Sequence, residues 1–229
     1  MSIIDLNELG AIIDRACDNF DEQELNLIIL TLKDYVKTLN DSQIKAYIYY
    51  LLSNAQGSIQ NIKCNQQERV WQYEQVELFN QIFYLRKSIK EKGFNSLELG
   101  LQISILTNLG NAFSNYGRTI NALKYYNKAL SLYPNYFMSL TNKAICLETY
   151  SRLLYDYSHC DLFLRQSYFD FNKANEEIIS YLENHNHDYE YYNNIKNSNE
   201  IHIEKIENYL TKDWLNCKLS MQVVALYCD

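Results

Sequence analysis

Apolar residues recur every three or four positions along most of the chain, which is the spacing of amphipathic helices. Turn residues are scarce, with one proline and six glycines among 229 residues, too few for a protein built from many short strands. The pattern predicts helices at residues 4–19, 22–39, 41–62, 67–92, 96–116, 119–133, 137–157, 161–183 and 199–215. We therefore expect an all-α protein.

Short polar residues mark the starts of three of these helices. Asp21, Asp41 and Ser96 stand at predicted N-caps, where a side-chain oxygen accepts a hydrogen bond from a free backbone amide. Before the last helix, residues 184–199 (NHNHDYEYYNNIKNSN) are polar and rich in tyrosine. This segment is predicted to be a loop or a linker.

The chain also repeats itself. A small residue, a bulky residue four positions on and another small residue three positions further occur in residues 81–89, 122–130 and 167–175, although Gln81 fits the first position poorly. Each of these segments follows another helix with small residues of its own, at residues 51–57, 108–114 and 141–147. The order predicts three pairs of helices, each with a first helix A and a second helix B.

The middle copy is the most complete. Residues 103–136 carry, at fixed intervals, Leu106, Leu109, Gly110, Phe113, Ala122, Tyr126, Ala129 and Pro134. This pattern resembles the tetratricopeptide repeat, a unit of 34 residues, with Leu106 in place of the usual tryptophan. The small residues let two helices approach closely, and the aromatic residues fill the space beside the crossing.

The flanking copies are degenerate. Downstream, helix B arrives about eleven residues late, which predicts an insertion near residues 153–164. Upstream, Ser53 and Ser88 are the counterparts of Gly110 and Ala129. We expect a single helical-hairpin solenoid domain over residues 1–229, with degenerate N-terminal hairpins at 1–95, a repeat core at 96–183, and a loop and capping helix at 184–229.

The resemblance implies a groove lined by the A helices that grips an extended peptide, with asparagines bonding its backbone. Asn108 and Asn142 are 34 residues apart at equivalent positions, and Asn111 lies one turn from Asn108. An amide side chain both donates and accepts, as a peptide unit does. The alternative is that asparagine is simply frequent in this sequence. Further predicted groove residues are Thr107, Ser114, Asn115, Met138, Thr141, Ile145, Glu148 and Thr149.

We therefore expect the chain to bind another protein or a peptide, and not to be an enzyme by itself. In some members of the family, groove lysines clamp a chain-terminal carboxylate. Thr107 occupies one such position here, which disfavours a carboxylate clamp.

A competing hypothesis is catalytic. Arg152 and His159, separated by six residues, resemble the R-x-x-x-x-x-x-H motif of HEPN ribonucleases, in which such a pair cleaves RNA. The structural alternative is a helical ion pair between Arg152 and Asp156, with His159 as a cap. Residues 100–215 also look like the repeat region of bacterial proteins that carry a separate C-terminal HEPN domain, which implies a nuclease-associated component of a defence or toxin system.

Charge and hydropathy limit the kinds of partner that we expect the chain to bind. The net charge of −7 disfavours direct binding of the whole molecule to nucleic acid, although Arg86, Lys87, Lys90 and Lys92 form a local basic cluster at a predicted helix end. Nowhere do 18 uncharged apolar residues occur together, and the chain starts without a secretory pattern, so we expect a cytoplasmic protein without a membrane span. The apolar segment CKLSMQVVALYCD, residues 217–229, is a predicted contact with the last helix or with another subunit in a homo-oligomer.

Metal and disulfide chemistry is not indicated. The six cysteines form no C-x-x-C pair and no regular spacing, which predicts reduced thiols, with Cys146 and Cys160 as small core residues. His185 and His187 could offer two imidazoles to a metal, but no third ligand at a suitable spacing accompanies them. We expect no cofactor.

Overall fold

The computed structural model describes residues 6–66, 75–154, 156–184 and 189–210. Within these ranges the chain is almost entirely helical and contains no strand. The helices are α1 (Leu6–Asp18), α2 (Glu22–Thr38), α3 (Ser42–Gln66), α4 (Gln75–Lys90), α5 (Leu99–Asn115), α6 (Thr119–Leu132), α7 (Phe137–Ser151), α8 (Tyr157–Asn184) and α9 (Tyr189–Tyr209), with a 3-10 turn, η1 (Phe94–Ser96), before α5. The all-α prediction is confirmed.

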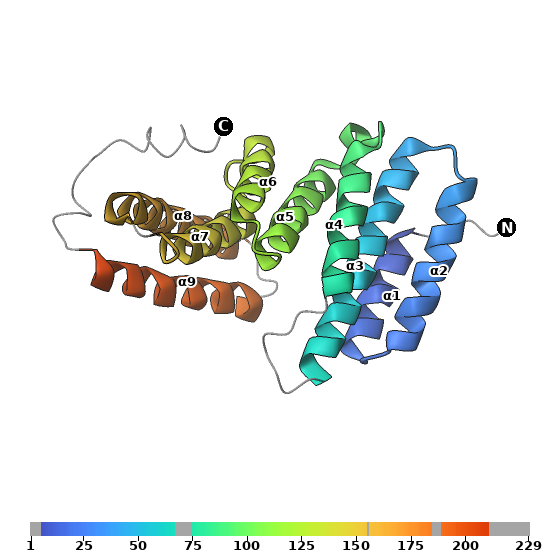
Figure 1. Cartoon of the computed structure of the whole chain (residues 1–229), viewed down its shortest axis with the longest axis horizontal. Helices are drawn as coiled ribbons and strands as arrows, with labels where there is room; N and C mark the ends of the chain where they lie inside the picture. Colours follow the sequence, from blue (N-terminus) through green and yellow to red (C-terminus); the bar gives the residue numbers. More distant parts are fainter. Residues whose placement is uncertain (1–5, 67–74, 155, 185–188, 211–229) are drawn as a thin grey trace. The chain divides into compact units, whose positions relative to one another are not determined.

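Two compact units divide the chain, at residues 1–116 and 117–229. The first contains α1 to α5, and the second contains α6 to α9 (Figure 1). The predicted arrangement as one domain with N-terminal hairpins, a core and a cap stays a prediction.

In the first unit, α3 lies at the centre and contacts α1, α2 and α4 (Figure 1). The core of this unit consists mainly of aliphatic side chains. Each helix supplies them from apolar positions spaced three or four residues apart, which face the neighbouring helices. On α2 the buried residues are Leu25, Ile28, Ile29, Leu32 and Val36. Burial of this stripe removes apolar surface from water, and this is the main driving force for packing the unit.

Small residues bring α3 and α4 together. Ser88, on α4, is fully buried, and its Oγ donates a hydrogen bond to the carbonyl oxygen of Ala46 on α3 at 2.7 Å. Ser53, the predicted small residue of the A helix, is also buried. A short side chain can reach the backbone of the facing helix only where the two helices lie close. The degenerate upstream copy is therefore a packed helix pair.

Gly93, in the turn after α4, packs closely against the start of α3. The hydroxyl of Ser42 accepts a hydrogen bond from the amide of Gly93 at 3.0 Å and donates one to Glu91 Oε2 at 2.9 Å. A Cβ atom placed on Gly93 would lie 2.2 Å from the backbone nitrogen of Gln43. The start of α3 and the turn after α4 can therefore meet only if residue 93 lacks a side chain.

Gly93→Ala should lower the free energy of unfolding by about 1–3 kcal/mol, because backbone must move away from the new methyl group. Gly100→Ala is the matched control, since a Cβ there meets nothing within 4 Å. Alanine also suits a helix better than glycine, so this control should be neutral or stabilising. Urea denaturation followed by circular dichroism measures both changes, and equal stability of the two variants would contradict the constraint.

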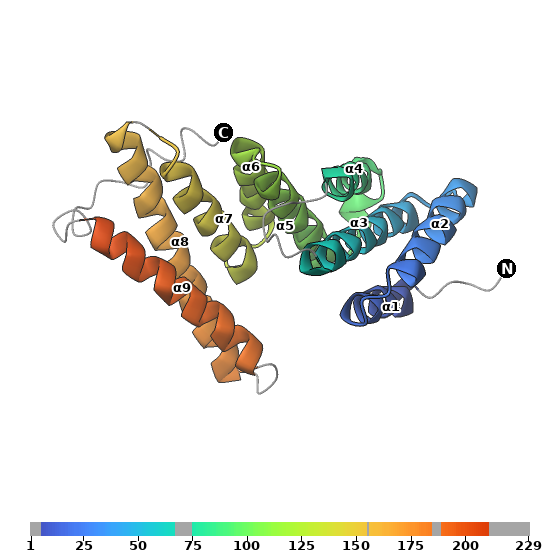
Figure 2. The same cartoon turned by 60° about the horizontal axis from the view of Figure 1, so that its bottom comes forward.

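The second unit repeats the same contact. Ser167 on α8 is fully buried, and its Oγ donates to the carbonyl oxygen of Ala144 on α7 at 2.8 Å. Phe171 and Ala174, which follow Ser167 in the predicted pattern, are also fully buried. Helix α9 packs along α8 (Figure 2). The degenerate downstream copy is therefore also a packed helix pair, covered by α9.

The middle copy consists of α5, which ends the first unit, and α6, which begins the second. Its small residues Gly110, Ala122 and Ala129 are all buried, and so is Tyr126. None of the small side chains that define the repeat points into solvent.

Two predicted N-caps are confirmed and one is wrong. Asp21 accepts from the amide of Glu24, and Asp41 accepts from the amides of Gln43 and Ile44. Ser96, however, ends the 3-10 turn η1, and α5 begins three residues later, after Glu98, without a side-chain cap bond. The turn is closed by backbone hydrogen bonds, which leave no role for a serine cap.

Two predicted boundaries are also wrong. Helix α9 begins at Tyr189, so most of the predicted loop 184–199 is helical. Most polar residues of this segment lie on the outer side of the amphipathic helix α9, whereas Asn199 is buried. Helix α7 ends at Ser151 and α8 begins at Tyr157, so the insertion near 153–164 mainly lengthens helix B. The amide of Ser158 bonds Asp156, which caps α8 and explains this start.

Candidate functional site

The predicted groove residues of α5 lie in two different environments. Asn108 and Asn111 are half-buried, and Asn115 is exposed at the end of the helix. Thr107 is buried, and its hydroxyl donates to the carbonyl oxygen of Ile103 at 2.8 Å. The asparagines therefore form an accessible stripe with helical spacing, whereas Thr107 lies on the packed side of α5.

Helix α7 has an open side and a packed side. Asn142 is half-buried, and Ile145 and Thr149, one and two turns further, are exposed. Thr141 and Glu148 are buried. Of the residues predicted on α7, Asn142 is thus accessible, while Thr141 and Glu148 are covered by other helices of the same unit.

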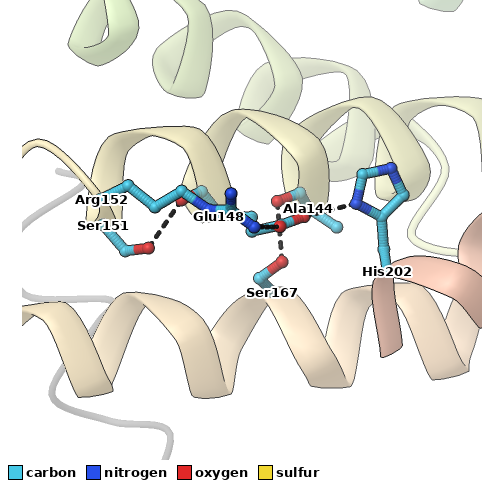
Figure 3. Close-up of polar contacts among 6 residues, drawn as sticks. All are labelled: Ala144, Glu148, Ser151, Arg152, Ser167 and His202. Atoms are coloured by element: carbon cyan, nitrogen blue, oxygen red, sulfur yellow. Dashed lines mark hydrogen bonds and ion pairs between the residues drawn. The ribbon is translucent and has the colours of Figure 1, made fainter. Parts of the chain in front are cut away.

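Glu148 is the centre of a polar cluster (Figure 3). Its carboxylate forms an ion pair with Arg152 one turn along α7, and its Oε2 lies 2.5 Å from Nδ1 of His202 on α9. The imidazole of His202 also stacks on the ring of Phe171, with ring centres 5.1 Å apart. One buried carboxylate therefore joins the end of α7 to α9.

The protonation of Glu148 follows from these partners. Burial by itself raises the pKa of this carboxyl group, because it penalises the charged form. His202 and Arg152 act in the opposite direction through hydrogen bonds and charge, and together they lower the pKa below its ordinary value. Glu148 is therefore ionised at neutral pH.

A second polar group, Asn199, links α9 to α7 and α8 by hydrogen bonds. Asn199 is fully buried, and its side-chain nitrogen donates to Oγ1 of Thr141 on α7 at 3.1 Å and to Oδ1 of Asn175 on α8 at 2.9 Å. A buried amide that lacks such partners would lose free energy on leaving water. Asn199 therefore specifies how α9 docks on α7 and α8.

Asn199 and His202 were not among the predicted site residues. The signal for them was the helical spacing of Ile195, Asn199, His202 and Ile206, which continues upstream of the predicted helix start. A polar residue within an apolar stripe is readily interpreted as exposed. Only the tertiary structure shows that Asn199 is buried and that His202 is half-buried beside Glu148.

The two predicted catalytic residues are bound to different carboxylates. Arg152 pairs with Glu148, and Nδ1 of His159 lies 2.5 Å from Oδ2 of Asp156. Hydrogen bonds from Ser158 and then from His159 lower the pKa of Asp156 to about 2. The predicted helical pair of Arg152 with Asp156 was wrong, because α7 ends at Ser151, before Asp156 can follow on the same helix.

A pocket of about 650 Å³ opens beside this cluster, within the second unit. It lies between the end of α7, the start of α8 and the end of α9, and Leu164 and Ile206 form part of its apolar wall. Arg152 and Lys205 place two cations at the same pocket. The buried thiol of Cys160 also lines it, and the burial of Cys160 and of Cys146 confirms both as core residues.

Residues 103–136 match the family model of the tetratricopeptide repeat. The chain contains a tetratricopeptide repeat. These residues are α5, α6 and the turns around them, so the match covers the middle copy of the pattern. The all-α fold of helix pairs is that of a tetratricopeptide-like solenoid, and such repeats generally mediate protein–protein interaction. The resemblance to bacterial proteins with a HEPN domain stays a prediction.

No curated protein matches the chain. No solved structure matches it. Among the helices that the structure describes, none is long and apolar enough to cross a membrane. The described residues also contain no group of three or more histidine, cysteine or acidic side chains placed to hold a metal ion. His185, His187 and residues 217–229 lie outside the described residues.

Glu148→Gln should lower the free energy of unfolding at neutral pH by about 1–3 kcal/mol, because an amide replaces a charged acceptor that pairs with Arg152 and bonds His202. The pKa of Glu148 is lower in the folded chain, so its contribution is complete above the unfolded-state pKa of about 4.3 and is lost as pH falls through the folded-state pKa. The difference between wild type and variant should therefore shrink in acid.

Thermal and urea denaturation across the acidic range measure this effect. Glu204→Gln is the control, because Glu204 is exposed on α9, and it should change stability by no more than about 0.5 kcal/mol. A gap between wild type and Glu148→Gln that stays constant with pH would contradict the assigned role of Glu148.

Proposed function

We propose that this protein is an adaptor that captures an extended peptide segment of another protein, using asparagines on the first helices of its repeats. The tetratricopeptide repeat supports the general class of function. Extended peptides expose backbone amides and carbonyls, and asparagine side chains can bond both. The proposed contacts are the accessible asparagines of α5 in the first unit and of α7 in the second unit.

One observation carries this proposal. Asn108 and Asn142 are at equivalent positions of successive A helices, 34 residues apart, and both are half-buried. Neither side chain forms a hydrogen bond with another residue that the structure describes. Each of these amides can donate to and accept from a peptide backbone.

The structure refines which predicted residues can contribute. Thr141 and Glu148 bond Asn199 and His202 of α9, so an incoming peptide does not reach them while α9 is docked. The hydroxyl of Thr107 already donates a hydrogen bond to the carbonyl oxygen of Ile103 in the same helix. We therefore assign peptide contact to Asn108, Asn111, Asn115 and Asn142, with Ile145 and Thr149 as neighbours on the open side of α7.

Asn108→Ala combined with Asn142→Ala should weaken binding of the captured partner by about tenfold or more, because two hydrogen bonds to the peptide backbone are lost. Capture from a native lysate, identification of the bound protein and peptide mapping would supply the ligand. Isothermal titration with the mapped peptide would then measure the affinity of wild type and variant.

Asn61→Ala combined with Asn197→Ala is the matched control, because both residues are exposed and lie on α3 and α9, which supply none of the proposed contacts. This control should bind as wild type does. Unchanged affinity of the Asn108 and Asn142 variant, with its helicity intact, would refute the proposed contact.

A further inference from the structure

One side of α4 is exposed along the whole helix. Among the side chains of α4 that the structure describes, the exposed ones are Val76, Phe79, Phe83, Arg86, Lys87 and Lys90. These six residues are called the α4 open face. Three are large and apolar, three are cationic, and none is acidic. This composition is unusual in a chain with 28 acidic and 21 basic residues.

The α4 open face is not needed to fold the unit. The opposite sides of α4 bury Leu78, Ile82 and Leu85 against the neighbouring helices, and Ser88 bonds α3. Phe79 and Phe83 nevertheless leave 59% and 45% of their surface exposed. Neighbouring large apolar side chains left in water commonly mark an interaction surface.

The apolar and cationic residues are separated along the helix axis. Val76, Phe79 and Phe83 occupy the first half of α4, and the three cations occupy the last turns. At 1.5 Å per residue, the face from Val76 to Lys90 is about 21 Å long. Lys87 stands at the border, with its Nζ 4.7 Å from the ring centre of Phe83.

We propose that the α4 open face binds an acidic amphipathic helix of a partner protein. Apolar residues of that helix, spaced three or four apart, would cover Val76, Phe79 and Phe83, and its acidic residues would meet the three cations. The fit rests on charge complementarity together with the apolar half of the face, since like-charged residues would be repelled from the cationic half.

Extended polyanions fit the surroundings less well. The unit as a whole is not basic, because α1 and α2 carry six acidic residues against three basic ones, and this disfavours an extended polyanion; the acidic residues are Glu8, Asp14, Asp18, Glu22, Glu24 and Asp34, and the basic ones are Arg15, Lys33 and Lys37. A short acidic helix meets only the charges beside it, because salt screens charges beyond about 8 Å at physiological ionic strength. The α4 open face shares no residue with the proposed asparagine contacts, so each proposal can fail without the other.

The test uses the full chain and a fluorescein-labelled designed peptide of about 18 residues, long enough to form a helix of several turns. It carries leucines on one side and glutamates on the other, and a second peptide has lysine in place of every glutamate. Fluorescence anisotropy should show binding of the acidic peptide, with the basic peptide at least about tenfold weaker. A higher salt concentration should weaken binding of the acidic peptide, because salt screens the attraction between opposite charges.

Two variants localise the binding. Phe79→Ser with Phe83→Ser, and separately Arg86→Glu with Lys87→Glu and Lys90→Glu, should each weaken the acidic peptide by about tenfold or more. Lys124→Glu with Lys128→Glu is the control, because both lysines are exposed on α6, and it should bind within about twofold of wild type. Far-UV circular dichroism checks that every variant is folded, and Phe79→Leu with Phe83→Leu should restore binding.

The proposal would be overturned if the acidic peptide did not bind. It would also be overturned if the variants of the α4 open face bound the peptide as tightly as the wild-type chain does. Oligo-dT and vesicles of equal parts phosphatidylcholine and phosphatidylserine are measured in parallel. Binding of either one that depends on the α4 open face, without binding of the acidic peptide, would assign the face to a different class of ligand and also overturn the proposal.

Discussion

Close contact between paired helices is the constraint on which the structure depends. In both units a buried serine of the second helix donates to a backbone carbonyl of the first, Ser88 to Ala46 and Ser167 to Ala144. A hydroxyl on a single carbon reaches that carbonyl only when the helices are close, and a larger side chain would separate them. Ser88 is the second small residue of its pattern and Ser167 is the first, so each degenerate pair uses a different small position for this kind of contact.

The helix that covers the second unit depends on a different interaction, the pairing of buried polar groups. Asn199 and His202 of α9 meet Thr141 and Glu148 of α7. Burying these groups without any polar partner would be costly, so α9 docks where each of them has at least one. This docking also decides which side of α7 is covered and leaves Asn142, Ile145 and Thr149 accessible.

The two proposed contacts differ chemically. Amide side chains suit a backbone in extended conformation, whereas the α4 open face, apolar at one end and cationic at the other, suits a ligand with side chains of matching type. An adaptor that holds two partners would need two surfaces that differ in this way, because binding at one must not compete with binding at the other.

The sequence by itself determined the class of fold, the repeat and most helix boundaries. Glycine, alanine, serine and aromatic residues at fixed intervals report backbone contact directly, since few other residues fit there. Asp21 and Asp41 likewise reported helix starts, because a cap is a local interaction. Tertiary structure decided the rest. Asn199 and Glu148 are polar in sequence yet buried, Arg152 pairs with Glu148 instead of Asp156, and the exposure of Phe79 and Phe83 depends on what packs beside α4. These outcomes rest on partners distant along the chain, which local pattern does not specify.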